Sequence, residues 1–153
     1  MDYQQALDYI YSFIDYETVP RPRDAANYDL RRMEELLGRL GNPHLKAKSV
    51  HIAGSKGKGS VAAMMASALT ASGYTTGLFT SPHLIRIEER IRVAGEAIPA
   101  RRFAGLVDLI TKVEADLLQR RTLDRPLTYF EIVTAAAFEH FARERIDVAL
   151  VEA

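Results

Sequence analysis

The fold of this chain is constrained most by a glycine-rich loop between a short apolar run and a long helix-forming segment. Residues 49–53 (SVHIA) form the β-branched apolar run, and residues 61–73 (VAAMMASALTASG) favour a helix. Between them lie Gly54, Ser55, Lys56, Gly57, Lys58, Gly59 and Ser60. This order of strand, glycine loop and helix predicts an α/β fold with a mostly parallel sheet.

The loop residues predict a binding site for phosphate groups. Glycines let the backbone turn tightly and direct consecutive N–H groups at phosphate oxygens, and the helix N-terminus adds a partial positive charge. Lys58 is expected to reach the terminal phosphates of a nucleotide such as ATP. The Ser60 hydroxyl is placed to bind a Mg²⁺ ion that bridges those phosphates.

The spacing within the loop differs from the general phosphate-loop pattern G-x-x-x-x-G-K-[ST]. Here Gly54 lies three residues before Gly57, and Gly59 separates Lys58 from Ser60. The alternative interpretation is an ordinary glycine-rich turn in which the two lysines are only solvated. The position of the loop between a strand and a helix favours phosphate binding.

Hydrophobic patterning predicts the other elements of a three-layer, P-loop NTPase-like α/β fold. Strands are expected at residues 75–80 and 146–152, a hairpin within 86–99, and helices at 99–121 and 128–145. Two helices are expected before the sheet, with apolar faces formed by Leu7, Ile10, Tyr11 and Ile14 and by Leu30, Met33, Leu36, Leu37 and Leu40. The chain stops just after a strand, at the edge where ligand-binding loops usually follow, so we expect it to be truncated.

The composition of the chain argues against several classes of protein. Its 20 basic and 20 acidic side chains cancel, which disfavours binding to nucleic acid or to an anionic membrane. No apolar run approaches the roughly 18 residues of a membrane span, and the first residues lack the features of a signal peptide. The 153 residues contain no cysteine, so we expect a cytoplasmic protein without disulfides or thiolate metal sites.

The glycine loop and three further stretches carry a resemblance to a known family. The variant G-[ST]-x-G-K-G-S after V-H-I-A resembles the nucleotide loop of folylpolyglutamate synthases and dihydrofolate synthases, within the Mur ligase superfamily. Residues 36–43 (LLGRLGNP) and 128–131 (TYFE) also resemble segments of this family. Residues 80–84 (TSPHL), together with Glu89, Arg90 and Ile91, resemble its Ω-loop. Other Mur ligases usually end this loop with Lys-Thr-Thr or Lys-Thr-Ser, which favours the folate branch. Lys56 stands where that branch usually has Asn, and it adds a second cation near the phosphates.

The resemblance implies a fold of the Mur ligase central-domain type. Residues 1–153 would be the N-terminal portion of an ATP-binding domain, with a helical lead-in at 1–45 and the P-loop α/β core at 46–153. The remainder of that domain and a C-terminal glutamate-binding domain would be absent. The full-length protein is expected to be a monomer, and this chain alone is expected to be inactive.

The resemblance also implies a reaction, the ATP-dependent formation of an amide. A carboxylate of dihydropteroate or of a folate would attack the γ-phosphate of ATP, and the amine of L-glutamate would attack the resulting acyl phosphate. Lys58 would be the catalytic residue, and the loop from Gly54 to Ser60 would bind the nucleotide. Ser60, Ser81 and Glu131 would hold Mg²⁺, which prefers oxygen ligands.

Several of these residues have simpler interpretations. Thr128 and Glu131 also fit a capping box, in which the carboxylate bonds back to the Thr128 backbone N–H at the start of a helix. Ser81 before a proline is an ordinary turn signal, and His83 beside that proline is typical of a turn or surface residue. Arg90 is a weak candidate for contact with a substrate, so the roles of His83 and Arg90 stay open.

Three other functions stay open as well. Another Mur-type amino-acid ligase would use the same phosphate loop for a different acceptor. A non-catalytic P-loop module would bind nucleotide and carry out no ligation. A nucleotide kinase ranks last, because the sequence has no arginine-rich lid pattern and the Ser-Pro-His-Leu loop has no role in such an enzyme.

Overall fold

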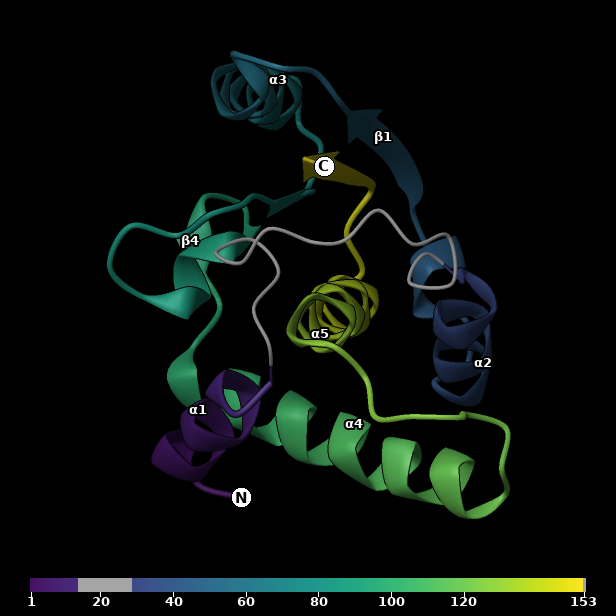
Figure 1. Ribbon diagram of the computed structural model, residues 1–153. Coiled ribbons are helices and arrows are strands. Elements are labelled where there is room, and N and C mark those ends of the chain that lie inside the picture. The colour runs from purple at the N-terminus through teal and green to yellow at the C-terminus, as the bar shows by residue number, and fades with distance from the viewer. Residues whose placement is uncertain (14–28, 153) are drawn as a thin grey trace. The chain divides into compact units, whose positions relative to one another are not determined.

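A five-stranded sheet with the strand order β1-β5-β2-β3-β4 carries the glycine loop (Figure 1). Strands β1, β5 and β2 are parallel, whereas β3 and β4 form an antiparallel hairpin that pairs with β2. The strands are β1 (Lys48–Ile52), β2 (Thr76–Phe79), β3 (Ile91–Val93), β4 (Glu96–Ala97) and β5 (Val148–Glu152). Because β1, β2 and β5 are parallel, all three end at the same side of the sheet, which we call the carboxyl edge.

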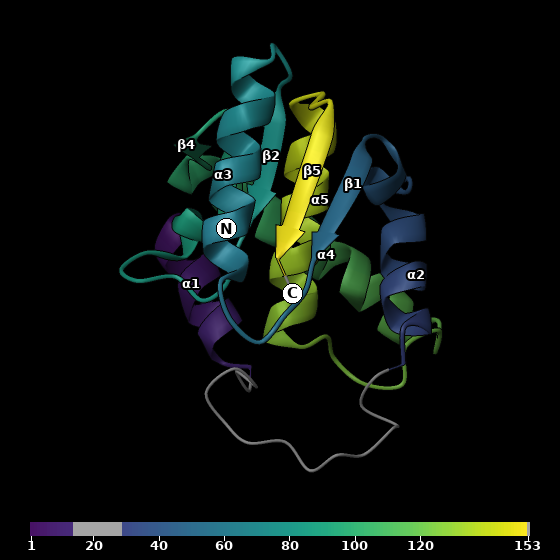
Figure 2. The ribbon, with the colours of Figure 1, turned by 90° about the horizontal axis from the view of Figure 1, so that it is seen from above.

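Helices cover both faces of the parallel strands. Helix α3 (Lys58–Ala71) lies on one face and the C-terminal part of α5 (Tyr129–Arg143) lies on the other, as Figures 1 and 2 show. Ile52, Ala62 and Leu150 form the core between α3 and the sheet. The expected three-layer α/β fold is therefore confirmed, with three parallel strands at its centre and an antiparallel hairpin at one side.

The chain divides into two units in the computed structural model, which describes residues 1–13 and 29–152. The sheet unit comprises His44–Ala100 and Ala137–Ala153, and the helical unit comprises Met1–Pro43 and Arg101–Ala136. The sheet unit contains the predicted phosphate loop and Ser81. No helix in the described part of the chain is both long enough and apolar enough to cross a membrane.

The helical unit is organised around α4 (Ala100–Gln119). Its apolar face buries Phe103, Leu106, Val107, Ile110 and Leu117. The Tyr9 hydroxyl of α1 (Tyr3–Tyr11) bonds to the buried Glu114 carboxylate, which also accepts a 2.6 Å hydrogen bond from the Leu127 backbone. Arg39, at the end of α2 (Arg31–Arg39), pairs with Asp116. Polar contacts thus join α1 and α2 to the same long helix.

The buried faces of α1 and α2 agree in part with the apolar faces expected from sequence, since Ile10, Leu36 and Leu37 are buried as expected. In α1 the buried residues are Ala6 and Ile10, whereas Tyr11 is 51% exposed. Leu30 precedes α2 and is 73% exposed, while Arg32 is buried instead. Helical spacing favours large apolar side chains as the core, but a small alanine packs well where elements approach closely. Ile14 and the proline-containing segment 18–24 lie outside the described residues.

The packing of β2 against the helix behind it gives a first prediction. A Cβ atom added to Gly77 would lie 2.6 Å from Ile146 Cδ1 and 2.8 Å from the Phe141 ring, whereas one added to Gly105 in α4 meets nothing within 4 Å. We expect Gly77→Ala to lower the free energy of unfolding by about 1–3 kcal/mol through overpacking. Gly105→Ala should raise it by about 0.5–1 kcal/mol, because alanine favours a helix. Urea denaturation of both variants measures the two effects, and equal stabilities would contradict the packing described.

Candidate functional site

The phosphate loop joins the end of β1 to the start of α3 at the carboxyl edge. Helix α3 begins at Lys58, so Lys58, Gly59 and Ser60 form its first turn, where backbone N–H groups have no carbonyl partner within the helix. Gly57 precedes them with φ +76°, a conformation that L side chains rarely adopt. Residues 54–57 are exposed. The predicted phosphate-binding residues therefore lie together in one exposed turn and the helix start that follows it.

The Lys58 side chain folds back over this loop. Its Nζ donates a 3.0 Å hydrogen bond to the Gly54 carbonyl oxygen. A phosphate oxygen is a stronger acceptor than a neutral carbonyl, because a hydrogen bond between two charged groups is stronger. The Lys58 ammonium is thus already held at the loop, where a bound phosphate would offer it a better partner.

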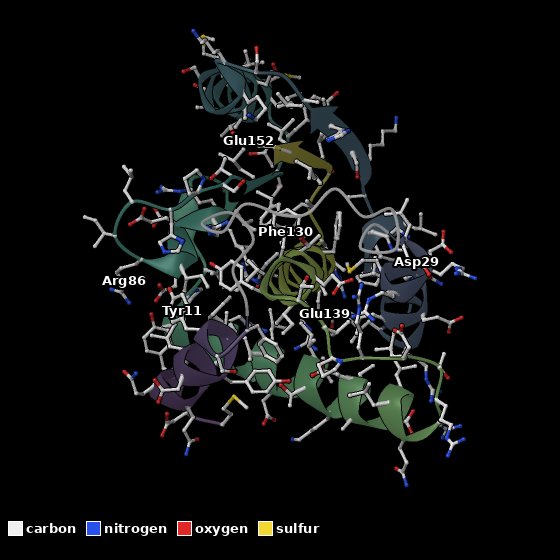
Figure 3. All side chains as sticks on the ribbon, viewed as in Figure 1. Tyr11, Asp29, Arg86, Phe130, Glu139 and Glu152 are labelled. Carbon is white, nitrogen blue, oxygen red and sulfur yellow. The ribbon has the colours of Figure 1, made fainter. Side chains whose placement is uncertain are left out.

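Glu152 is a site residue that the sequence analysis missed. It ends β5 at the carboxyl edge, is only 6% exposed, and accepts a 3.3 Å hydrogen bond from the Ser81 backbone N–H through Oε2. A Cβ atom added to Gly59 would lie 3.7 Å from the same oxygen. Figure 3 shows Glu152 at the end of its strand beside α3. The carboxylate therefore stands between the first turn of α3 and Ser81. An acidic residue at the carboxyl end of a buried parallel strand was the signal available in the sequence.

Ser81 begins a loop that runs from the end of β2 to the 3-10 turn η3 (Ile87–Arg90) and closes on itself. The Thr80 backbone N–H donates to the Arg90 carbonyl at 3.0 Å, which joins the two ends of the loop. At the tip, Leu84 and Ile85 are 92% and 85% exposed. The loop therefore holds Ser81 at its base beside Glu152 and carries two apolar side chains into solvent.

The Glu89 carboxylate stabilises the tip of the Ser81 loop. It accepts hydrogen bonds from the backbone N–H groups of Leu84, Ile85 and Arg86, the shortest at 2.9 Å. These backbone donors favour the ionised carboxylate and hold the pKa of Glu89 below its usual range, the bond from Leu84 contributing most. The loop is therefore ordered by its own polar groups.

A cavity of about 850 Å³ opens beside these residues. Its walls are one side of α3, strand β2 and the turn of the β3–β4 hairpin, and Gly59, Ser81 and Glu152 line it at the carboxyl edge. Small-molecule sites commonly have volumes of this order. The loop, Ser81 and Glu152 thus open onto one space that is large enough for a ligand.

Glu131, the carboxylate predicted to bind Mg²⁺, lies in the helical unit and has partners there. Thr128 N–H donates to Oε2 at 2.7 Å and Glu131 N–H donates to Thr128 Oγ1 at 3.2 Å, which confirms the capping box at the start of α5. Arg32, buried and within 3.1 Å of Oε1, forms an ion pair with the same carboxylate. Both oxygens of Glu131 therefore accept hydrogen bonds from neighbours in its own unit. The metal role predicted for this residue stays a prediction.

The donor atoms around Glu152 suit a hard cation with few protein ligands. Within the described residues, no three carboxylate or imidazole side chains are grouped so that they could hold a metal ion. Ser60 lies in the first turn of α3, Glu152 lies beside Gly59 of the same turn, and the Ser81 backbone bonds to Glu152. Mg²⁺ typically takes one or two protein carboxylates, keeps several waters and binds substrate phosphates. One carboxylate with serine hydroxyls beside a phosphate loop fits that pattern.

Comparison with known proteins gives a consistent result. No family model matches the chain. The chain is 40% identical over 154 residues to the folylpolyglutamate synthase of Lacticaseibacillus casei, and 37% identical over 151 residues to the dihydrofolate synthase/folylpolyglutamate synthase of Bacillus subtilis. These matches cover 99% and 98% of this chain but 33% of each relative. The chain thus spans about a third of the length of the curated relatives it matches.

Solved structures of the same kind are similar over nearly the whole chain. A folylpolyglutamate synthase complex with AMPPCP and folate has a TM-score of 0.85 and 38% identity, over 99% of this chain and 35% of that chain. The Mycobacterium tuberculosis folylpolyglutamate synthase complexed with ADP has a TM-score of 0.82 and 33% identity, over 98% of this chain and 31% of that chain. The chain is therefore similar to these enzymes in sequence as well as in fold.

Proposed function

Because this chain belongs to the folylpolyglutamate synthase/dihydrofolate synthase family, we propose that it forms the ATP- and Mg²⁺-binding part of a glutamate ligase. The ligase would add L-glutamate to dihydropteroate, to a reduced folate, or to both. Residues 1–45 would be the helical lead-in and residues 46–153 the α/β core of its ATP-binding domain. A cytoplasmic location and a monomeric full-length protein stay predictions.

One observation carries the proposal: the phosphate loop, the Ser81 loop and Glu152 meet at the carboxyl edge of three parallel strands. This arrangement occurs in a chain whose relatives include enzymes solved with an ATP analogue and with ADP. The residues that bind the nucleotide would be Gly54, Ser55, Lys56, Gly57, Lys58, Gly59 and Ser60. Their exposed N–H groups and the two lysines offer positive charge to the phosphates.

For Mg²⁺, we favour Ser60, Ser81 and the Glu152 carboxylate as protein ligands. Ser60 lies in the first turn of α3 and Ser81 follows β2, so Glu152 has a potential oxygen ligand on each side. Mg²⁺ bound there would neutralise charge on the phosphates of ATP. Glu131 is the competing carboxylate, and its ion pair with Arg32 supports a structural role for it.

The residues of this chain would act on the first half of the reaction. A free carboxylate is a poor acyl donor, so the acceptor carboxylate would take the γ-phosphate of ATP before the amine of glutamate attacks. Phosphoryl transfer depends mainly on positioning and on neutralising charge. The N–H groups of the loop would orient the phosphates, and Lys58 would bond to the oxygens that gain charge. Lys58 is therefore the residue to which we assign a catalytic role.

Mass spectrometry of the products tests this function. The full-length gene product receives Mg-ATP and L-glutamate with either dihydropteroate or tetrahydrofolate in parallel reactions, and a control reaction omits ATP. We expect a mass gain of one glutamate in at least one complete reaction and none without ATP. Bound nucleotide with no gain in either reaction would favour a different Mur-type acceptor or a binding module without ligase activity.

A further inference from the structure

His83 and Arg90 form a contact within the Ser81 loop that the proposed site does not use directly. Arg90 is 1% exposed, and its Nε donates a 2.8 Å hydrogen bond to His83 Nδ1. Because a guanidinium Nε only donates, Nδ1 must accept, and the proton of the neutral imidazole is then on Nε2. The buried Arg90 guanidinium needs hydrogen-bond acceptors of this kind, because burying a charged group without them costs free energy.

The contact joins the two sides of the loop close to Ser81. His83 is two residues beyond Ser81, whereas Arg90 lies at the far end of the loop, where its carbonyl accepts the Thr80 N–H. Glu89, the neighbour of Arg90, holds the tip between them through the backbone N–H groups of residues 84–86. The path of the chain after Ser81 is therefore fixed by polar contacts inside the loop.

The position of Ser81 matters because it faces Glu152. Its backbone N–H donates to Glu152 Oε2, and both residues line the cavity beside the phosphate loop. A loop that loses its internal contacts would let Ser81 move away from this carboxylate. We infer that His83 and Arg90 are positioning residues, which hold the Ser81 loop so that Ser81 and Glu152 present their oxygens to one Mg²⁺ ion. This inference rests on the proposed function for the metal, although the loop contact itself does not.

Two nearly isosteric substitutions at His83 separate the hydrogen bond from the bulk of the side chain. Asparagine places an acceptor oxygen near the position of Nδ1, whereas leucine places a methyl group there. Nucleotide affinity of the full-length gene product is measured by calorimetry, with excess Mg²⁺ and with EDTA. We expect His83→Leu to weaken binding about tenfold in Mg²⁺, as for a lost hydrogen bond to a charged group, and to leave affinity in EDTA unchanged. His83→Asn should stay within about twofold of the parent in both conditions.

A second measurement reports on the loop without any nucleotide. The Arg86 side chain is 61% exposed at the end of the loop tip, which makes the following peptide bond a site for trypsin when the loop opens. Cleavage there should be about tenfold faster in His83→Leu and unchanged in His83→Asn. Leu84→Ser is the matched control, because it alters a 92% exposed side chain of the same loop and should change neither readout.

The outcomes distinguish this inference from the proposed function. Equal behaviour of the leucine and asparagine variants in both measurements would overturn the inference. So would a loss of affinity in His83→Leu that is the same with Mg²⁺ and with EDTA, because it would show a general structural effect. If the parent protein binds nucleotide without any dependence on Mg²⁺, the proposed metal site is wrong. The metal-positioning role of His83 and Arg90 is then wrong as well. Faster cleavage at Arg86 in His83→Leu would in that case show only that the contact orders the loop.

Discussion

Replacing Lys58 with alanine is expected to abolish detectable binding of Mg-ATP. The Lys58 ammonium already bonds to the Gly54 carbonyl, so it lies over the loop that would surround the phosphates. Its removal takes away a charge-assisted donor and a positive charge at the helix start, and we expect affinity to fall by about 100-fold or more. Isothermal titration calorimetry of the full-length gene product with Mg-ATP measures the change.

Lys56→Ala is the matched control for that variant. It removes the same charge from the same loop, but Lys56 is an exposed residue of the turn before the helix. We expect a loss of about threefold or less, as for a solvated charge. Equal losses in the two variants would mean that the loop attracts phosphate through its net charge alone. Unchanged affinity in Lys58→Ala would remove the catalytic assignment of this residue.

Glu152→Gln is expected to remove most of the Mg²⁺ dependence of nucleotide binding and to lower kcat by about 100-fold or more. Glutamine keeps the size of the side chain and an oxygen that can accept the Ser81 N–H, so the variant mainly removes the negative charge. Without that charge, a hard cation bound there would lose the carboxylate that lies beside the first turn of α3. A titration of Mg²⁺ at fixed nucleotide, together with the melting temperature, measures the result.

Glu131→Gln makes the same chemical change at the competing carboxylate. This variant weakens a capping box and the ion pair with the buried Arg32, so we expect the free energy of unfolding to fall by about 2 kcal/mol. The Mg²⁺ dependence should be unchanged. The reverse pattern, with stability preserved and Mg²⁺ dependence lost, would support the metal role predicted from sequence for Glu131 and would contradict the role proposed for Glu152.

Local patterns in the sequence were sufficient to predict elements of both units. The run at residues 49–53 is β1 (Lys48–Ile52), and the pattern over 99–121 is α4 (Ala100–Gln119). Both predictions use neighbouring side chains, which determine whether a segment alternates or follows a helical period. The burial of Arg32 could not be predicted in this way. It depends on Asp124, Glu131 and two carbonyl groups far along the chain.

The same distinction applies to the site. The phosphate loop is a continuous motif, so its residues were recognised together. Glu152 was interpreted only as the end of a strand, because its meaning depends on Ser81, 71 positions away, and on the first turn of α3. For Glu131 the local pattern alone gave the capping box, which the hydrogen bonds confirm. His83 and Arg90 were noted one by one, and their contact emerged only from the folded loop.

The direction of the parallel strands also makes the side of the sheet opposite the carboxyl edge useful for spectroscopy. The turn between α3 and β2 lies there, where Asp147 and Thr75 bond to each other, and Tyr74 in that turn is 50% exposed. The 14 residues of α3 separate this turn from the phosphate loop by about 20 Å. Because the chain contains no cysteine, Tyr74→Cys would give it a single thiol for a fluorescent dye. Such a dye would report on nucleotide binding from a distance without touching the phosphate loop.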